Sequence, residues 1–152
     1  NNIRLQAIGD LSRLPEKTRL TLLDGIELTK NNTRMTLVLA LNYSSRWEIV
    51  EAAKKIAAQV VNGELTIDQI DNDVFSNNLT TKNIPDPELL IRTSGEHRIS
   101  NYLLWQAAYS ELYFTNVLWP DFRKDDFYLA ILDFQNRERR FGKTSEQLSE
   151  IV

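Results

Sequence analysis

The spacing of apolar residues near the start of the chain changes from a strand pattern to a helix pattern and back. From Ile3 to Ala7 apolar residues alternate with polar ones, and the run stops at Gly9, which predicts a short strand followed by a turn. Helical spacing follows from Pro15 to about Asn31. The run MTLVLAL, Met35 to Leu41, is apolar on both faces and predicts a strand covered by helices on both sides of a parallel sheet.

The clearest helical pattern comes next, in the stretch NYSSRWEIVEAAKKIAAQVVNG. Apolar residues recur there at three-and-four spacing and stop before Gly63. Ser45 and Glu48 are spaced as a capping box, which predicts that the helix begins at this serine.

Three further elements are predicted after a polar, irregular stretch. Leu89 to Ile91 reads as another buried strand, the segment from Asn101 to Phe114 is helical in length and composition, and a last helix runs from about Asp125 to Arg139. Strands that alternate with helices indicate an α/β fold with a mostly parallel sheet flanked by helices.

Composition narrows the class of protein. The 152 residues with 42% hydrophobic content fit one domain with a real core. The net charge of −3 gives no global positive field for nucleic acid, so an anion site has to be local. There is no cysteine, which fits a reducing compartment, and no apolar run approaches the ~18 to 20 residues of a membrane span. A cytoplasmic protein is the expectation, with a peripheral position at a membrane as its variant.

The stretch IRTSGEHRIS concentrates polar chemistry at the end of a predicted strand, the usual ligand-binding position in a parallel sheet. Arg92 and Arg98 offer guanidinium groups, Ser94 and Ser100 offer hydroxyls, and Gly95 allows backbone N–H groups to approach a ligand. These groups suit a phosphate. Polar loops with solvated arginines are also common, so spacing alone leaves both interpretations open.

Two more residues have competing interpretations. His97, the only histidine, serves either as a hydrogen-bonding orienter or as a metal ligand or general base, and zinc is disfavoured without a second histidine or a cysteine. Glu111 is either a partly exposed helix position or a hard oxygen ligand for Mg²⁺, which takes one or two carboxylates and completes its shell with water and phosphate oxygens.

The blocks RTSGEHRISNYLLWQAAYSELYF, LWPDF and RERRFG, in this order, closely resemble the C-terminal signature of cis-prenyltransferases, most closely that of bacterial undecaprenyl diphosphate synthases. IRLQAIGD and NYSSRWEIV are similar to the same family, so the resemblance covers essentially the whole chain. It implies an enzyme that condenses isopentenyl diphosphate units in cis onto an allylic diphosphate such as farnesyl diphosphate, with Mg²⁺. The implied product is undecaprenyl diphosphate, a membrane lipid and the precursor of the lipid carrier of cell-wall synthesis.

The resemblance also assigns roles to residues. It implies that Arg92, Arg98 and Ser100 bind isopentenyl diphosphate, that His97 helps to orient them, and that Glu111, in the family's YxE, is a Mg²⁺ ligand. Strand 35–41 resembles one wall of the tunnel that holds the growing chain, although plain sheet core explains it equally well.

The terminal RFG resembles the element that reaches across a dimer interface. Arg140 and Gly142 would then contact the partner's active site, and a homodimer is expected.

Two departures from the family pattern qualify these expectations. NYSSR stands where the family has NYGGR, and no DGNGRW-like motif with its essential aspartate is found. The expectation is therefore that residues 1–152 are the C-terminal portion of a single domain whose N-terminal part is missing, with no catalytic residue in this chain, and that this polypeptide alone cannot condense prenyl units. The alternative is a non-catalytic partner subunit of a cis-prenyltransferase.

Overall fold

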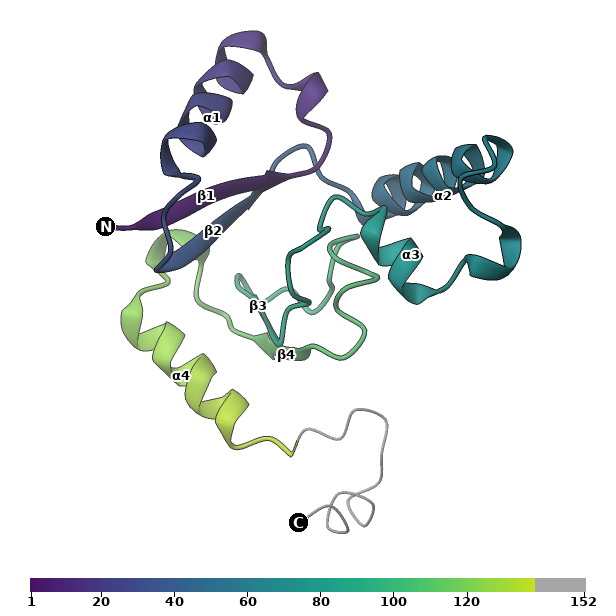
Figure 1. Ribbon diagram of the computed structural model, residues 1–152. Helices are drawn as coiled ribbons and strands as arrows, with labels where there is room; N and C mark the ends of the chain where they lie inside the picture. The colour runs from purple at the N-terminus through teal and green to yellow at the C-terminus, as the bar shows by residue number, and fades with distance from the viewer. Residues whose placement is uncertain (139–152) are drawn as a thin grey trace. The chain divides into compact units, whose positions relative to one another are not determined.

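The computed structural model describes residues 1–138, which form two compact units (Figure 1). The first unit comprises Asn1–Pro85 and Asn101–Leu103. The second comprises Asp86–Ser100 and the described residues from Leu104 onward. Each unit contains its own pair of parallel strands and is described by itself.

The first unit opens with a strand, a helix and a second strand, as the sequence predicts. These are β1 (Ile3–Ile8), α1 (Glu16–Thr29) and β2 (Met35–Ala40), with a short 3-10 helix at Leu11–Arg13. The two strands pair in parallel, from Ile3 opposite Met35 to Ile8 opposite Ala40, and α1 lies along them (Figure 1). A helical crossover is required here because a short turn cannot join parallel strands.

The outer edge of β1 is protected by the end of α1. The Leu5 N–H donates to Thr29 Oγ1 at 3.0 Å, and Asn32 Nδ2 donates to the Ile3 carbonyl at 2.7 Å. Strand edges with free polar groups invite pairing with other chains, so these two side chains cap the edge. Gly25 allows the close approach, since a Cβ there would lie 3.3 Å from Leu5 Cδ2.

The prediction of β2 as a fully covered core strand is wrong within the described residues. Met35 is 52% exposed and Leu37 is 46% exposed, and no residue of β2 is buried. The physical reason is that α1 packs mainly against β1. The apolar run therefore predicts the strand correctly but not its burial.

The predicted long helix is confirmed as α2 (Ser45–Val61), followed by a 3-10 helix at Ile67–Gln69 and by α3 (Asn72–Asn77). The predicted capping box is wrong. Ser44 is the N-cap, so Ser45 is already helical and Glu48 lies one position beyond the box. Glu48 is buried and makes long-range hydrogen bonds instead.

The second unit contains β3 (Leu89–Arg92), β4 (Glu111–Phe114), a 3-10 helix at Trp119–Asp121 and α4 (Lys124–Gln135). β3 and α4 are predicted elements, although β3 is half-buried rather than buried. The strands pair in parallel, with Leu89 opposite Glu111 and Arg92 opposite Phe114. Helix α4 packs against β4.

The helix predicted from Asn101 to Phe114 is wrong. Turns occupy residues 101–109, and the segment ends in β4. Asn101 and Leu103 have φ values of 61° and 48°, in the left-handed region that a right-handed helix excludes. The Tyr113 and Phe114 side chains favour a strand, and pairing with β3 overrides the helical composition of the segment.

The class predicted from the sequence, α/β with parallel strands flanked by helices, is confirmed. The buried apolar residues of the first unit are Ile8, Leu22, Ala52, Ile56 and Leu79. In the second unit, among the described residues, the buried apolar residue is Ala130 of α4. Among residues 1–138, no helix has both the length and the apolar character needed to cross a membrane.

The turn after β1 gives a first test. Gly9 has φ +108°, and a Cβ there would lie 2.2 Å from the Leu41 carbonyl oxygen. Gly9→Ala should lower the free energy of unfolding by more than about 2 kcal/mol, because the clash adds to the cost of a positive φ. Chemical denaturation measures it.

Gly63→Ala is the matched control. Gly63 also has a positive φ, +74°, but a Cβ there meets nothing within 4 Å. Its substitution should cost only about 1 kcal/mol. Equal losses for the two variants would show that the close approach at Gly9 is unimportant.

Candidate anion-binding site

Arg92 lies at the carboxyl end of β3 and is the best-positioned candidate for binding an anion in the second unit. Its main chain is fixed because the Thr115 N–H donates to the Arg92 carbonyl at 2.9 Å. Its Nε is buried and has no hydrogen-bond partner within the described part of the chain. A buried charged donor without a partner is costly, so an anion that accepts from Nε would remove this cost.

The turn after β3 holds its shape by using its own backbone donors. Ser94 and Gly95 have φ values of 69° and 67°, and their N–H groups donate to the carbonyls of Val117 and Thr115, each at 2.9 Å. These two N–H groups are therefore not available to a ligand, contrary to the expectation of free backbone donors there. The side chains of the loop are therefore the main candidate donors to an anion.

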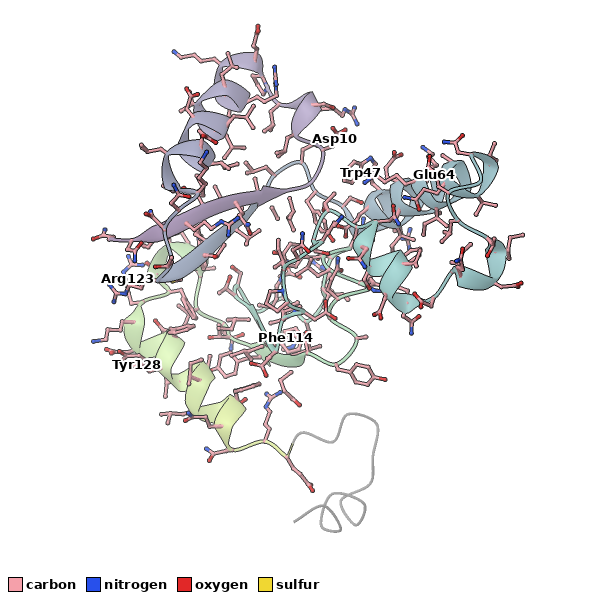
Figure 2. The ribbon with its side chains drawn as sticks, viewed as in Figure 1. Asp10, Trp47, Glu64, Phe114, Arg123 and Tyr128 are labelled. Carbon is pink, nitrogen blue, oxygen red and sulfur yellow. The ribbon has the colours of Figure 1, made fainter. Side chains whose placement is uncertain are left out.

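Phe114 is paired with Arg92 and contacts a residue of the turn, a role that the sequence analysis did not predict. It lies opposite Arg92 in the strand register, and the His97 ring packs against it with centroids 5.0 Å apart (Phe114 is labelled in Figure 2). Because side chains alternate between faces along a strand, Arg92 and Phe114 share one face of the β3–β4 pair. His97 thus contacts the ring of the residue that is paired with Arg92. The orienting role of His97 stays a prediction.

Arg98 and Ser100 are exposed residues of the same loop. The Arg98 side chain is 70% exposed and pairs with Glu96. An exposed ion pair contributes little to stability, so this guanidinium can turn to a ligand at small cost. Ser100 has φ 49°. The structure therefore places Arg92, His97, Arg98 and Ser100 on one loop, although no hydrogen bond within residues 1–138 joins their side chains.

Glu111 occupies a different place from the loop. It starts β4 opposite Leu89, three positions before the Arg92–Phe114 pair, so alternation directs its side chain to the other face. Its Oε2 accepts from Arg137 Nη1 at 2.9 Å. Glu111 and the arginine loop thus lie at different places on the β3–β4 pair.

Arg137 holds Glu111 from just beyond the end of α4. The guanidinium also contacts Asp133, with Nη2 and Oδ2 2.6 Å apart. The hydrogen bond that Arg137 donates to Glu111, and then the hydrogen bond to Asp133 and its charge, raise the pKa of Arg137, so this side chain stays charged. Glu111 would supply one oxygen to a Mg²⁺ ion only if Arg137 moved away, and a single carboxylate suits an ion that keeps several waters. No cluster of three or more potential ligands occurs among the described residues.

In the first unit, the NYSSR segment belongs to a polar network that the sequence analysis missed. Tyr43 Oη donates to Glu48 Oε2 at 2.6 Å, and the Thr80 N–H donates to Glu48 Oε1 at 2.8 Å. Burial and then the bond to Glu48 raise the pKa of Tyr43. Asn101 is hydrogen-bonded to the same segment. Thr80 and Asn101 are far in sequence from the groups that they contact, so no local pattern reveals these partners.

Comparison with known proteins decides the family. The family model described as "Putative undecaprenyl diphosphate synthase" matches residues 1–142. The chain belongs to this family. The resemblance noted in the sequence is thus confirmed. Arg140 and Gly142 lie outside the described residues, so the structure says nothing of the dimer tail.

Curated relatives of this prenyltransferase chain are similar over most of its length. It is 55% identical over 148 residues to an isoprenyl transferase of Chlorobaculum tepidum, covering 97% of this chain and 56% of that protein. It is 47% identical over 152 residues to a ditrans,polycis-undecaprenyl-diphosphate synthase, (2E,6E)-farnesyl-diphosphate specific, of Vibrio vulnificus, covering 100% and 61%. The chain thus spans somewhat over half the length of these relatives.

Solved structures confirm the fold of the prenyltransferase chain. Lavandulyl diphosphate synthase from Lavandula x intermedia, in complex with dimethylallyl diphosphate, superposes with a TM-score of 0.90 at 44% identity, covering 93% of this chain and 61% of that one. A probable undecaprenyl diphosphate synthase from Campylobacter jejuni gives 0.81 at 40% identity, covering 94% and 64%.

The Tyr43–Glu48 contact predicts a pH dependence. Because the pKa of Tyr43 is raised in the folded state, its proton stabilises the prenyltransferase chain fully below about pH 10, the usual tyrosine pKa. Stability should fall above that pH, since the unfolded state ionises first. Tyr43→Phe should remove this part of the slope and cost about 1 to 3 kcal/mol at pH 7, because buried Glu48 loses a donor. Urea unfolding at pH 7 and above pH 10 measures the free energy of unfolding of both proteins.

Tyr102→Phe is the control for this experiment. Tyr102 packs edge-on against Tyr43, with centroids 5.6 Å apart, and burial raises its pKa also. Its substitution should change the slope above pH 10 but cost less at pH 7, because Glu48 keeps its donors. An equal loss at pH 7 in both variants would contradict the proposed importance of the Glu48 bond.

Proposed function

We propose that this chain binds isopentenyl diphosphate for a cis-prenyltransferase that builds undecaprenyl diphosphate, a long-chain polyprenyl diphosphate, from an allylic diphosphate such as farnesyl diphosphate. The single observation that carries the proposal is the buried, unpartnered Nε of Arg92 at the carboxyl end of a parallel strand pair. Family membership supports it, as do the names of the relatives, which are prenyl diphosphate synthases. Because the chain spans just over half of those relatives, the whole activity is proposed for the complete gene product that contains it.

Arg92 is the centre of the proposed diphosphate site. Its backbone is fixed by the β3–β4 ladder, in which it is paired with Phe114. A fixed guanidinium binds phosphate oxygens with two parallel hydrogen bonds, and Nε is one of the two donors in that geometry. Arg92 therefore holds and orients the diphosphate.

Arg98 and Ser100 complete the site from the exposed part of the loop. Each hydrogen bond to a charged group contributes roughly 1.5 to 3 kcal/mol, so three residues supply about 4.5 to 9 kcal/mol. Micromolar binding requires about 8 kcal/mol, so the loop alone reaches this affinity only at its upper limit. Further donors or a metal are needed for tight binding.

The chemistry explains why such a site holds its ligand by the diphosphate end. In the condensation the carbon–oxygen bond of the allylic diphosphate breaks, a new carbon–carbon bond forms to the isopentenyl unit, and that unit then loses a proton. The isopentenyl diphosphate keeps its own diphosphate throughout. Arg92, Arg98 and Ser100 are therefore positioning groups for the acceptor, and close positioning alone lowers the barrier substantially.

Magnesium and a homodimer are the remaining parts of the proposal. When bound, Mg²⁺ neutralises the negative charge that develops on a departing diphosphate. Glu111 is its proposed ligand, on the face of the β3–β4 pair opposite Arg92. Arg140 and Gly142 are proposed to contact the partner subunit. We also propose that residues 1–152 form part of one domain of the complete enzyme.

Arg92→Ala and Arg92→Lys test the diphosphate site. Arg92→Ala should raise the Kd for isopentenyl diphosphate about 10- to 100-fold, the value of one charged hydrogen-bonded contact. Arg92→Lys should recover little, because lysine keeps the charge but has no counterpart to Nε. Isothermal titration of the complete gene product measures both.

Lys54→Ala is the control, since Lys54 is an exposed cation that pairs with Glu51 on α2. It should leave the Kd unchanged. The proposal fails if Arg92→Ala binds isopentenyl diphosphate as well as the unchanged protein does, or if the unchanged protein binds none.

Glu111→Gln tests the metal ligand. It should raise the Mg²⁺ concentration that gives half-maximal turnover with farnesyl and isopentenyl diphosphates by about tenfold or more, because a neutral amide is a poorer ligand for this ion. Asp133→Asn disturbs the other carboxylate on Arg137 and should leave the Mg²⁺ requirement unchanged. A Mg²⁺ requirement that is equal in both variants would exclude Glu111 as a ligand.

A further inference from the structure

The segment that follows the candidate site has an unusual backbone. Ser100, Asn101 and Leu103 have φ values of 49°, 61° and 48°. None of them is glycine, and side-chain-bearing residues adopt the left-handed region mainly where surrounding contacts impose it. Contacts that hold Asn101 therefore also hold the backbone of Ser100, to which it is joined by a peptide bond.

Asn101 makes three hydrogen bonds to the start of α2. The Ser45 N–H donates to the Asn101 carbonyl at 3.0 Å, and the Arg46 N–H donates to its Oδ1 at 2.9 Å. Asn101 Nδ2 donates to Ser44 Oγ at 2.7 Å. The first N–H groups of a helix have no partner within the helix, so Asn101 caps α2 from a distant part of the sequence. This explains why the N-cap Ser44 makes no side-chain bond to its own helix.

The start of α2 is itself firmly held. Glu48, 1% exposed, accepts from Tyr43 Oη at 2.6 Å and from the Thr80 N–H at 2.8 Å. Tyr43 packs edge-on against Tyr102, the residue after Asn101. A buried carboxylate with several donors is costly to move. Asn101 is thus bound to a rigid anchor by both its backbone and its side chain.

We propose that Asn101 is a positioning residue for diphosphate binding, which sets the left-handed backbone of Ser100 by capping α2 and so presents the Ser100 hydroxyl to the ligand. The inference rests on the proposed function, in which Ser100 binds isopentenyl diphosphate. It goes beyond that function because Asn101 touches no substrate and acts through its neighbour.

The test uses the complete gene product and isopentenyl diphosphate as the titrant. Asn101→Ala should raise the Kd about 10- to 100-fold, the penalty typical of a displaced contact group. Ser44→Ala removes one of the three bonds and should raise it about fivefold, while perturbing folding less. In steady-state kinetics the KM for isopentenyl diphosphate should rise and the KM for farnesyl diphosphate should not.

A double-mutant cycle tests whether Asn101 acts through the Ser100 hydroxyl. In a Ser100→Ala background, Asn101→Ala should cause no further loss of affinity, because the hydroxyl it positions is already gone. Asn83→Ala is the matched control: Asn83 also has a positive φ, 65°, and is exposed. It should leave the Kd unchanged.

The outcomes separate this inference from the proposed function. If the unchanged protein binds isopentenyl diphosphate but Asn101→Ala and Ser44→Ala bind it equally well, Asn101 is only a structural cap and the inference is wrong. Losses that add fully in the Ser100→Ala background, or equal increases of both KM values, also overturn it. Absence of binding by the unchanged protein overturns the proposed function, and the inference with it.

Discussion

The burial of the Glu48 carboxylate is the constraint on which the first unit depends. At 1% exposure it has to be matched by donors, and these come from Tyr43 and Thr80, far apart in the sequence. This requirement fixes the start of α2 relative to the segments that contain Tyr43 and Thr80. Asn101 then binds to that fixed point. The buried Glu48 carboxylate and the Asn101 cap thus hold the same end of α2.

The register of β3 and β4 has the corresponding role in the second unit. Because Arg92 is opposite Phe114 and Glu111 is opposite Leu89, the strand pair separates the guanidinium from the carboxylate by both position and face. Helix α4 then provides Arg137 on the side of Glu111. The second unit thus has two separate charged centres.

The sequence predicted the elements with regular local patterns and missed those set by distant partners. Strands β1 to β3 and helices α1, α2 and α4 follow from apolar periodicity, and the loop from Arg92 to Ser100 follows from its charge. The helix predicted for Asn101–Phe114 was wrong because pairing with β3 and residues with left-handed φ values override the helical composition of this segment. The predicted Ser45–Glu48 capping box was wrong because its spacing does not reveal that Glu48 binds Thr80, which is 32 residues away.

The opposite placement of Arg92 and Glu111 also has an electrostatic consequence. Three strand positions correspond to roughly 10 Å along the ladder, which is about the Debye length at 0.1 M salt. Salt at this concentration therefore weakens the influence of the Glu111–Arg137 pair on the loop. In a chain with an overall charge of −3, the guanidinium groups of Arg92 and Arg98 are thus local positive charges at one end of a strand pair. Under the proposed function, they would act on a small anion at short range.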